Sequence, residues 1–403
     1  VQNQPLSYSD EDIAAAVADV RARIDAGRPA ADIAALRQAI DWLLAGARPL
    51  VYAGHGCRVA GAQQAVRGLI EAHGVPVVVS WMSSDLIPAA HPLNFGAPGG
   101  LAPLSANQVL FEADRILFLG ARLDLGTTAF QRDDFGAQAE RLIVDVDPAE
   151  LAKFDALPRT RTLRADLNAL SAAADGVPAQ GRFAGWRAWC GARRTTYLTE
   201  EQARLDHGRL NVFGVTKLLS AWSADKIFVP TGSGWAIEGF LRFFAPQEGA
   251  RCFFGGSLGA MGLGLPQALG AAFAGRGRVI CIEADGGLML NIQELATLAH
   301  YQPRGFVLFV LNNRGYGSIA ASQDRHFGMR AGADEGSGVS IPDYAKVAPA
   351  FGLPYRRIDT LAALLALLLA LDAETAPVFV DLMIDETESS GPAVKTDVSP
   401  DGK

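Results

Sequence analysis

The chain of 403 residues is 49% hydrophobic and 20% charged, with a formal net charge of −7. A chain of this length is expected to fold into two or three domains, and its composition excludes an intrinsically disordered protein. The acidic balance excludes a general attraction to nucleic acid or to an anionic membrane surface. The longest apolar run, Leu361–Leu371, is too short to span a bilayer, and the polar N-terminus does not resemble a signal peptide.

The cysteines are scattered along the chain and form no C-x-x-C pair. Isolated thiols of this kind are typical of proteins from a reducing compartment, where they serve as structural side chains. The pattern therefore predicts a cytoplasmic protein and argues against a zinc site. The four positions are Cys57, Cys190, Cys252 and Cys281.

Local patterns predict a lead segment followed by a first α/β domain. Residues 1–35 are predicted to form a linker that carries an Ala-rich helix, Asp12–Ala26. Residues 36–175 are predicted to form a central domain, because apolar strands alternate there with helical patterns. In chain order, the predicted elements are helix Arg37–Leu44, strand Pro49–Ala53, helix Ala60–His73, and strands Val75–Val79, Ile116–Leu119 and Leu142–Val146.

A small glycine cluster follows the first of these strands. The strand runs into Gly54-His55-Gly56, and Gly61 comes shortly after. This spacing departs from the G-x-G-x-x-G fingerprint of dinucleotide sites. We therefore favour a tight strand-to-helix turn, while a nucleotide-binding oxidoreductase that uses NAD(P) stays open as a rival function.

The second half of the chain predicts another α/β domain. Residues 176–205 are predicted to form a linker and a helix, in which Trp186, Trp189 and Tyr197 are expected to pack. Residues 206–388 are predicted to form the second domain, and residues 389–403 a polar tail. In chain order, its predicted elements are helix Val212–Ser223, strands Lys226–Pro230 and Val279–Ile282, helix Asn291–Tyr301, strand Phe306–Leu311, helices Pro342–Phe351 and Leu361–Leu371, and strand Val378–Met383.

The fold class that follows is α/β, with two doubly wound parallel sheets that carry helices on both faces. Between the predicted elements of the second domain lies a polar, glycine-rich loop, Ser322–Ser340. It is interpreted either as a lid that orders over a substrate or as a plain mobile loop.

The most informative stretch is the strand–helix–strand unit between Val279 and Gly317. Its first strand ends in Asp285-Gly286-Gly287 and its second in Asn312-Asn313-Arg314-Gly315. Because a parallel crossover brings both tips to the carboxyl edge of the sheet, we expect them to meet where ligands bind.

These tips suit a divalent cation beside a phosphate. The Asp285 carboxylate, the Asn313 side-chain carbonyl and the Gly315 backbone carbonyl offer the oxygen ligands that Mg²⁺ prefers. Gly286 and Gly287 let backbone N–H groups approach a phosphate. The alternative is an ordinary turn in which Asp and Asn act as turn formers.

Two stretches resemble the motifs of a known family. The Asp285-Gly286 pair followed by Asn312-Asn313 resembles the diphosphate–metal motif of thiamine diphosphate (ThDP) enzymes. The stretch Gly255–Gly270 is similar to the segment of those enzymes that holds the aminopyrimidine ring. The chain therefore resembles acetolactate synthase large subunits over their central and C-terminal cofactor-binding domains. Ala284 stands where the motif usually has glycine, which should be tolerated if the backbone there is not at positive φ.

The resemblance implies roles for further residues. Ser233, Gly234 and Trp235, in the turn that follows Pro230, would help to hold the diphosphate, although this turn departs from the family pattern at Gly232. Met261 would be the apolar prop under the bent cofactor, and the carbonyl of Gly259 would accept a hydrogen bond from its 4′-amino group. Gly286 and Gly287 would lie against the diphosphate, and Asp285, Asn313 and Gly315 would bind Mg²⁺.

The resemblance also implies a function and a missing part. Such enzymes decarboxylate a 2-oxo acid and often ligate the product to an acceptor, as homodimers or homotetramers. Their activating glutamate lies in an N-terminal pyrimidine domain that no segment here resembles, so no catalytic residue is assigned. The chain is expected to be a fragment, inactive alone; the alternative is that another chain supplies this domain. FAD is the less favoured further cofactor. A 2-oxo acid decarboxylase, an acyloin lyase and a non-catalytic interaction protein stay open.

Overall fold

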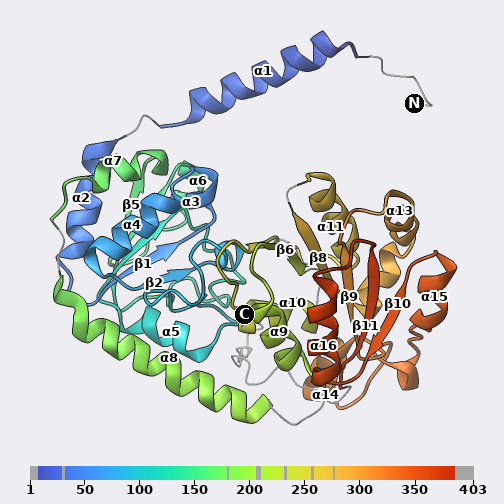
Figure 1. The fold of residues 1–403 in the computed structure, drawn as a ribbon. Coiled ribbons are helices and arrows are strands. Elements are labelled where there is room, and N and C mark those ends of the chain that lie inside the picture. Colours follow the sequence, from blue (N-terminus) through green and yellow to red (C-terminus); the bar gives the residue numbers. More distant parts are fainter. Residues whose placement is uncertain are drawn as a thin grey trace.

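A computed structural model describes residues 8–29, 32–178, 181–205, 210–230, 234–255, 258–275 and 277–385. It contains two parallel sheets with helices on both faces, so the predicted fold class is confirmed (Figure 1). Within these residues, no helix combines the length and the apolar character needed to cross a bilayer.

The first domain is built on an all-parallel sheet of five strands in the order β2-β1-β3-β4-β5. The order places β1 in the interior of the sheet, paired in register with both neighbours (Val51 lies beside Val77 and Leu117). The strands are β1 (Pro49–Ala53), β2 (Val77–Val79), β3 (Arg115–Leu119), β4 (Glu140–Asp145) and β5 (Thr160–Arg164).

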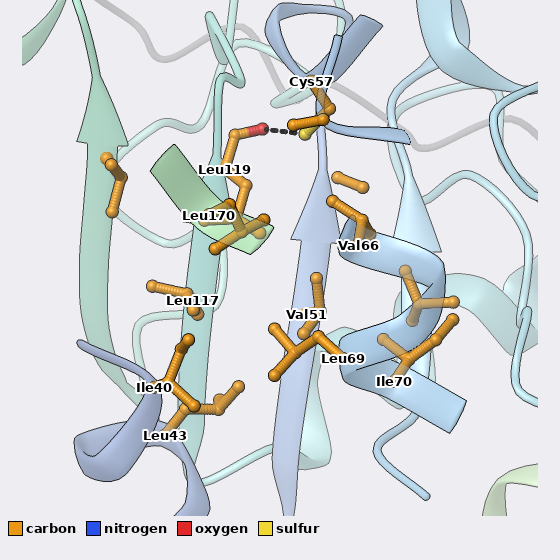
Figure 2. Packing of buried hydrophobic residues seen from close by; sticks show 14 of the residues in the cluster. Ile40, Leu43, Val51, Cys57, Val66, Leu69, Ile70, Leu117, Leu119 and Leu170 are labelled. Carbon is orange, nitrogen blue, oxygen red and sulfur yellow. Dashed lines mark hydrogen bonds between the residues drawn. The ribbon is translucent and has the colours of Figure 1, made fainter. Parts of the chain in front are cut away.

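Helices cover both faces of this sheet, because alternate residues of each strand point to opposite sides. Figure 2 shows one face, where Val51 of β1 and Leu117 of β3 pack against the apolar sides of helices. On the other face, the rings of Tyr52 and Phe118 pack at a tilt of 35° with centroids 5.1 Å apart. The helices of this domain are α2 (Ile33–Leu44), α3 (Gly56–Val59), α4 (Gln63–His73), α5 (Leu104–Glu112), α6 (Pro148–Ala152), α7 (Leu170–Ala174) and α8 (Ala184–Leu205).

Helix α8 packs against the sheet of the first domain. The buried indole of Trp186 donates its N–H to the carbonyl of Pro49 at 2.9 Å and stacks on Trp189 with centroids 5.2 Å apart. The predicted packing of these two tryptophans is therefore confirmed, whereas the Tyr197 side chain lies outside the described part. By contrast, α1 (Asp10–Gly27) stands apart from both domains in Figure 1 and buries none of its residues.

The second domain is built on an all-parallel sheet of six strands in the order β10-β11-β9-β8-β6-β7. The two strands of the informative stretch, β8 and β9, are neighbours in the centre of this sheet, as the sequence predicts. The strands are β6 (Lys226–Pro230), β7 (Arg251–Cys252), β8 (Arg278–Ala284), β9 (Val307–Asn312), β10 (Tyr355–Ile358) and β11 (Val378–Met383).

Helices again cover both faces. Helix α16 begins after Thr360, whose side chain accepts from the N–H of Ala363, and it buries Leu364 and Leu368 while Leu369 is exposed. The helix predicted over its range is thus present, but only one side of it packs on the sheet. The helices are α9 (Val212–Ala221), α10 (Trp235–Phe243), α11 (Gly264–Phe273), α12 (Asp285–Leu288), α13 (Glu294–Tyr301), α14 (Gly317–His326), α15 (Tyr344–Ala350) and α16 (Leu361–Leu371).

The prediction was wrong at some boundaries. The helix expected over Asn291–Tyr301 begins only at Glu294, because a 3-10 turn, Met289–Asn291, follows the short helix α12. The start of the predicted loop Ser322–Ser340 is the last part of helix α14. Strands β5, β7 and β10 were not predicted, because they are short edge strands without an apolar run.

Candidate functional site

A cavity of about 120 Å³ lies at the carboxyl edge of the second sheet, where β8 and β9 end. Its wall contains seven of the residues that the sequence analysis singled out: Gly234, Met261, Asp285, Gly286, Gly287, Asn313 and Gly315. Residues from four separate segments of the chain therefore meet at one place. The remaining lining residues are mostly apolar and include Val212, Leu311, Ile319 and Ile384.

Among the described residues that line this cavity, Asp285 alone carries a carboxylate. Its side chain is 1% exposed, and its two oxygens accept from the N–H groups of Gly286 at 2.7 Å and Gly315 at 3.1 Å. Burial raises the pKa of Asp285 to about 7, and the backbone N–H groups oppose that rise. A buried carboxylate of this kind is stabilised by a cation, and its remaining lone pairs suit Mg²⁺.

The two adjacent asparagines at the end of β9 have different environments. Asn312 is buried and donates its side-chain N–H to Asp381 at 2.9 Å, and Asp381 also accepts from the hydroxyl of Tyr355 at 2.8 Å. Asn313 lines the cavity together with Asp285. The structure therefore gives Asn312 a packing role and leaves Asn313 at the cavity.

The backbone around Asp285 explains the residue types found there. Ala284 has φ −91° and ψ 153°, so the backbone meets the condition under which alanine is expected to be tolerated at this position. A Cβ added to Gly286 would lie 2.2 Å from the Tyr316 ring, and one added to Gly287 would lie 2.5 Å from the Glu283 carboxylate. Both glycines are thus needed for close packing behind the cavity.

The segment that carries Met261 is tied to the same place. The carbonyl of Gly262 accepts from the side chain of Asn291 at 2.8 Å, and the N–H of Gly264 donates to Glu283 at 2.9 Å. Glu283 is fully buried in β8. Neither side chain was predicted to belong to the site, although a carboxylate inside an apolar strand is a signal that could have pointed to Glu283.

The start of α14 supplies further lining residues that the sequence analysis missed. Tyr316 and Ser318 follow directly after Gly315 and line the cavity. The Ser318 hydroxyl donates to Glu238 of α10 at 3.1 Å, and burial raises the pKa of Glu238. Tyr316 and Ser318 could have been predicted to line the cavity from their position just after the tip of β9.

The predicted loop lies beside this tip. The Gly315 backbone forms an antiparallel bridge with Asp334, and the carboxylate of Asp334 pairs with Arg330 at 2.6 Å. Arg330 also pairs with Asp324 at 2.6 Å. These contacts hold the loop against the proposed metal ligand; the choice between a lid and a mobile loop stays a prediction.

Three further residues were predicted to contact the cofactor: Gly259, Ser233 and Trp235. Gly259, at φ 62°, lines a separate cavity of about 940 Å³ between the two domains, together with His55, Trp81 and Phe254. Ser233 lies outside the described residues. Trp235 is the first residue of α10, but its side chain is not among those described.

Metal binding at the smaller cavity would rest on a mixed set of oxygens. Among the described residues, no group of three His, Cys, Asp or Glu side chains is arranged to hold a metal ion. The predicted ligands differ from such a group, because only Asp285 is a carboxylate, while Asn313 offers an amide and Gly315 a backbone carbonyl. Their presence on one cavity wall fits a cation that also binds phosphate and water.

Comparison with known proteins adds an independent finding. The family model described as "Thiamine pyrophosphate enzyme, central domain" matches residues 36–170, and "Thiamine pyrophosphate enzyme, C-terminal TPP binding domain" matches residues 234–382. The second match contains Asp285 and Asn313, and both matches fall on the two sheet domains.

Several proteins are similar over most of the chain. The acetolactate synthase isozyme 1 large subunit of Escherichia coli (strain K12) is 30% identical over 376 residues, which cover 92% of this chain and 64% of that protein. The probable acetolactate synthase 2, chloroplastic, of Oryza sativa subsp. japonica is 28% identical over 371 residues, covering 86% and 54%. An acetolactate synthase of Mycobacterium bovis is 30% identical over 328 residues, covering 79% and 52%. The chain thus spans roughly half to two thirds of the length of these relatives.

Proposed function

We propose that this chain, which belongs to the thiamine pyrophosphate enzyme family, forms the central and cofactor-binding parts of a ThDP- and Mg²⁺-dependent enzyme. The observation that carries the proposal is the meeting of Asp285, Asn313 and Gly315 on one cavity wall with Met261. The buried Asp285 carboxylate supplies the negative charge that attracts the cation, and the other two residues complete the protein's share of oxygen ligands.

Each part of the cavity has a role in this proposal. ThDP, when bound, supplies the electron sink for the reaction, and the protein supplies position and surroundings. Asp285, Asn313 and Gly315 would hold Mg²⁺ and through it the diphosphate end. Gly286 and Gly287 leave room for close approach, and Met261 offers an apolar, adaptable surface.

The activity of the whole enzyme is proposed more broadly from its relatives. The similar proteins are named acetolactate synthases, which favours a reaction on a 2-oxo acid that couples decarboxylation to carboligation. A 2-oxo acid decarboxylase or an acyloin lyase would use the same cofactor site. We propose that a glutamate outside these residues activates the cofactor and that the enzyme is a homodimer or homotetramer.

The test is a calorimetric titration of the chain with ThDP in the presence and absence of Mg²⁺. Wild-type protein is expected to bind ThDP only with Mg²⁺, and Asp285→Ala is expected to weaken binding at least about 100-fold. Asp359→Ala is the matched control, because Asp359 also directly follows a strand of the same sheet but is exposed and lies outside the cavity lining.

Two results would contradict the proposal. One is the absence of Mg²⁺-dependent ThDP binding by the wild-type chain. The other is equal affinity of the wild type and Asp285→Ala. A parallel titration with NAD(P) tests the rival oxidoreductase, which predicts binding that Asp285→Ala leaves unchanged.

A further inference from the structure

A buried carboxylate joins the two domains at a place away from the proposed metal site. Asp85 follows the 3-10 turn Trp81–Ser83 in the first domain, and its side chain is 1% exposed. One oxygen accepts from Arg58 of α3 at 2.8 Å. The other accepts from the Arg251 guanidinium at 3.0 Å and from the N–H of Cys252 at 3.0 Å.

The partners of Asp85 come from both domains. Arg58 belongs to the first domain, whereas Arg251 and Cys252 are the whole of strand β7 in the second. A buried carboxylate is costly unless it is paired and hydrogen-bonded, and Asp85 has two cationic partners and a backbone donor. Removing it would leave two arginines at a domain boundary without their shared counterion, so this contact fixes the position of β7.

Strand β7 has little else to hold it within its own sheet. It lies at the edge of the sheet and is two residues long, and within the described residues β6 is its single partner strand. Two other contacts join the domains near it, a hydrogen bond from the N–H of Ala89 to the carbonyl of Pro246 at 3.0 Å and an ion pair of Arg67 with Glu248 at 3.3 Å. Glu248 is largely exposed, and a surface ion pair of this kind contributes little.

The segment before Asp85 and the segment after β7 both line cavities described above. Shortly before Asp85, Trp81 and Met82 line the cavity between the domains. Shortly after β7, Phe254 and Gly255 line the same cavity. The same chain then continues to the segment that carries Met261, which lines the proposed cofactor cavity.

From this arrangement we infer that Asp85 is a positioning residue for the segment that follows β7. Through Arg251 and Cys252 it holds the N-terminal end of the segment that carries Gly259 and Met261, while Asn291 and Glu283 hold its C-terminal end at Gly262 and Gly264. This inference rests on the proposed function, in which Met261 contacts the cofactor near its pyrimidine end. The diphosphate end depends on β8 and β9, which are central strands with their own contacts. Asp85 therefore acts on one end of the cofactor and not on the other.

The test compares two probes on the full chain in the presence of Mg²⁺. ThDP reports both ends of the cofactor, and inorganic pyrophosphate reports only the diphosphate end. Asp85→Ala is expected to weaken ThDP binding roughly 10- to 100-fold, because small displacements of positioned groups have effects of this size, and to leave pyrophosphate binding unchanged. Arg67→Ala, which removes the exposed pair with Glu248, is the matched control and leaves both affinities unchanged.

A second variant, Arg251→Ala, tests the same contact in case Asp85→Ala does not fold. Arg251→Ala removes one cationic partner of Asp85, and the Arg251 side chain is partly exposed, so its loss disturbs the core less. Like Asp85→Ala, it is expected to weaken ThDP binding and to leave pyrophosphate binding unchanged. An equal loss of both affinities in the two variants, or an unchanged ThDP affinity, would overturn the positioning role. Failure of the wild-type chain to bind either probe would overturn the proposed function itself.

Discussion

The carboxyl edges of the two sheets are built from similar strand ends but use their backbone differently. In the first domain, the N–H of Gly54 donates to the carbonyl of Leu119 at 2.8 Å, and that of Gly56 donates to Gly120 at 3.0 Å. In the second domain, the N–H groups of Gly286 and Gly315 both donate to the carboxylate of Asp285. In the first domain these backbone donors are used in packing one chain segment against another, whereas in the second domain they surround a buried carboxylate.

This difference shows why a glycine cluster after a strand is a weak indicator of a ligand site. Gly54 and Gly56 are required because a Cβ on either would meet the backbone of Gly120, at 2.1 Å and 2.7 Å respectively. Their hydrogen-bond donors are already used within the chain. The preference for a tight turn over a dinucleotide fingerprint therefore has a physical reason in the structure.

The largest effect is expected from a substitution at the carboxyl edge of the first sheet. We predict that Gly54→Ala destabilises the first domain by about 3 kcal/mol, because the added methyl group overlaps backbone atoms that cannot move aside. The measurement is urea denaturation followed by circular dichroism. Gly68→Ala in α4 is the control, since nothing lies within 4 Å of the added Cβ and alanine favours a helix. Equal stability of Gly54→Ala and the wild type would refute the packing role.

Asn312 and Asn313, at the carboxyl edge of the second sheet, are expected to have different effects: one on stability and the other on ThDP binding. Asn313→Ala is expected to weaken Mg²⁺-dependent ThDP binding by roughly 10- to 100-fold with little change in stability. Asn312→Ala is expected to lower stability by about 1–3 kcal/mol, because it leaves the buried Asp381 carboxylate short of a donor, while ThDP affinity changes little. Calorimetric titration and thermal unfolding of both variants check this, and the reverse pattern would show that the wrong asparagine has been assigned.

Gly286→Ala should have a smaller effect on stability than Gly54→Ala. The added methyl group meets the Tyr316 ring, which is a side chain and can move, so we expect a loss of about 1 kcal/mol. Because Tyr316 lines the cavity, its displacement is also expected to weaken ThDP binding. Unfolding and titration of the same variant measure both effects. A stability loss as large as that of Gly54→Ala would contradict the distinction between the two edges.

The smallest expected effect concerns pH and the first domain. Burial lowers the pKa of His73, whose side chain lies at the end of α4. The folded state therefore binds this proton less readily than the unfolded state, whose pKa is about 6.5. Stability contributed by neutral His73 is complete above that value and is lost as the pH falls through the folded pKa. His73→Leu should flatten the acid side of the stability profile measured by denaturation, and an unchanged slope would exclude this residue as the cause.

Much of the fold was determined by the sequence alone. The strands Pro49–Ala53, Lys226–Pro230 and Val378–Met383 were predicted with the bounds that the structure shows. They could be predicted because each is a mainly apolar run bounded by polar or turn residues, although Lys226 begins the second strand and Asp381 lies within the third. Such a run is a local property of a strand buried on both faces. The meeting of the Asp285 and Asn313 tips also followed from parallel connection alone.

Other features were decided only by the tertiary structure. Adjacent asparagines have the same local sequence signal, and only the position of Asp381 on the neighbouring strand separates Asn312 from Asn313. Asp85 has no local pattern that predicts its partners, because Arg58 and Arg251 come from distant parts of the chain. The physical reason is common to both cases: strand pattern depends on near neighbours in sequence, whereas the partner of a buried polar group depends on which distant segments the fold brings together.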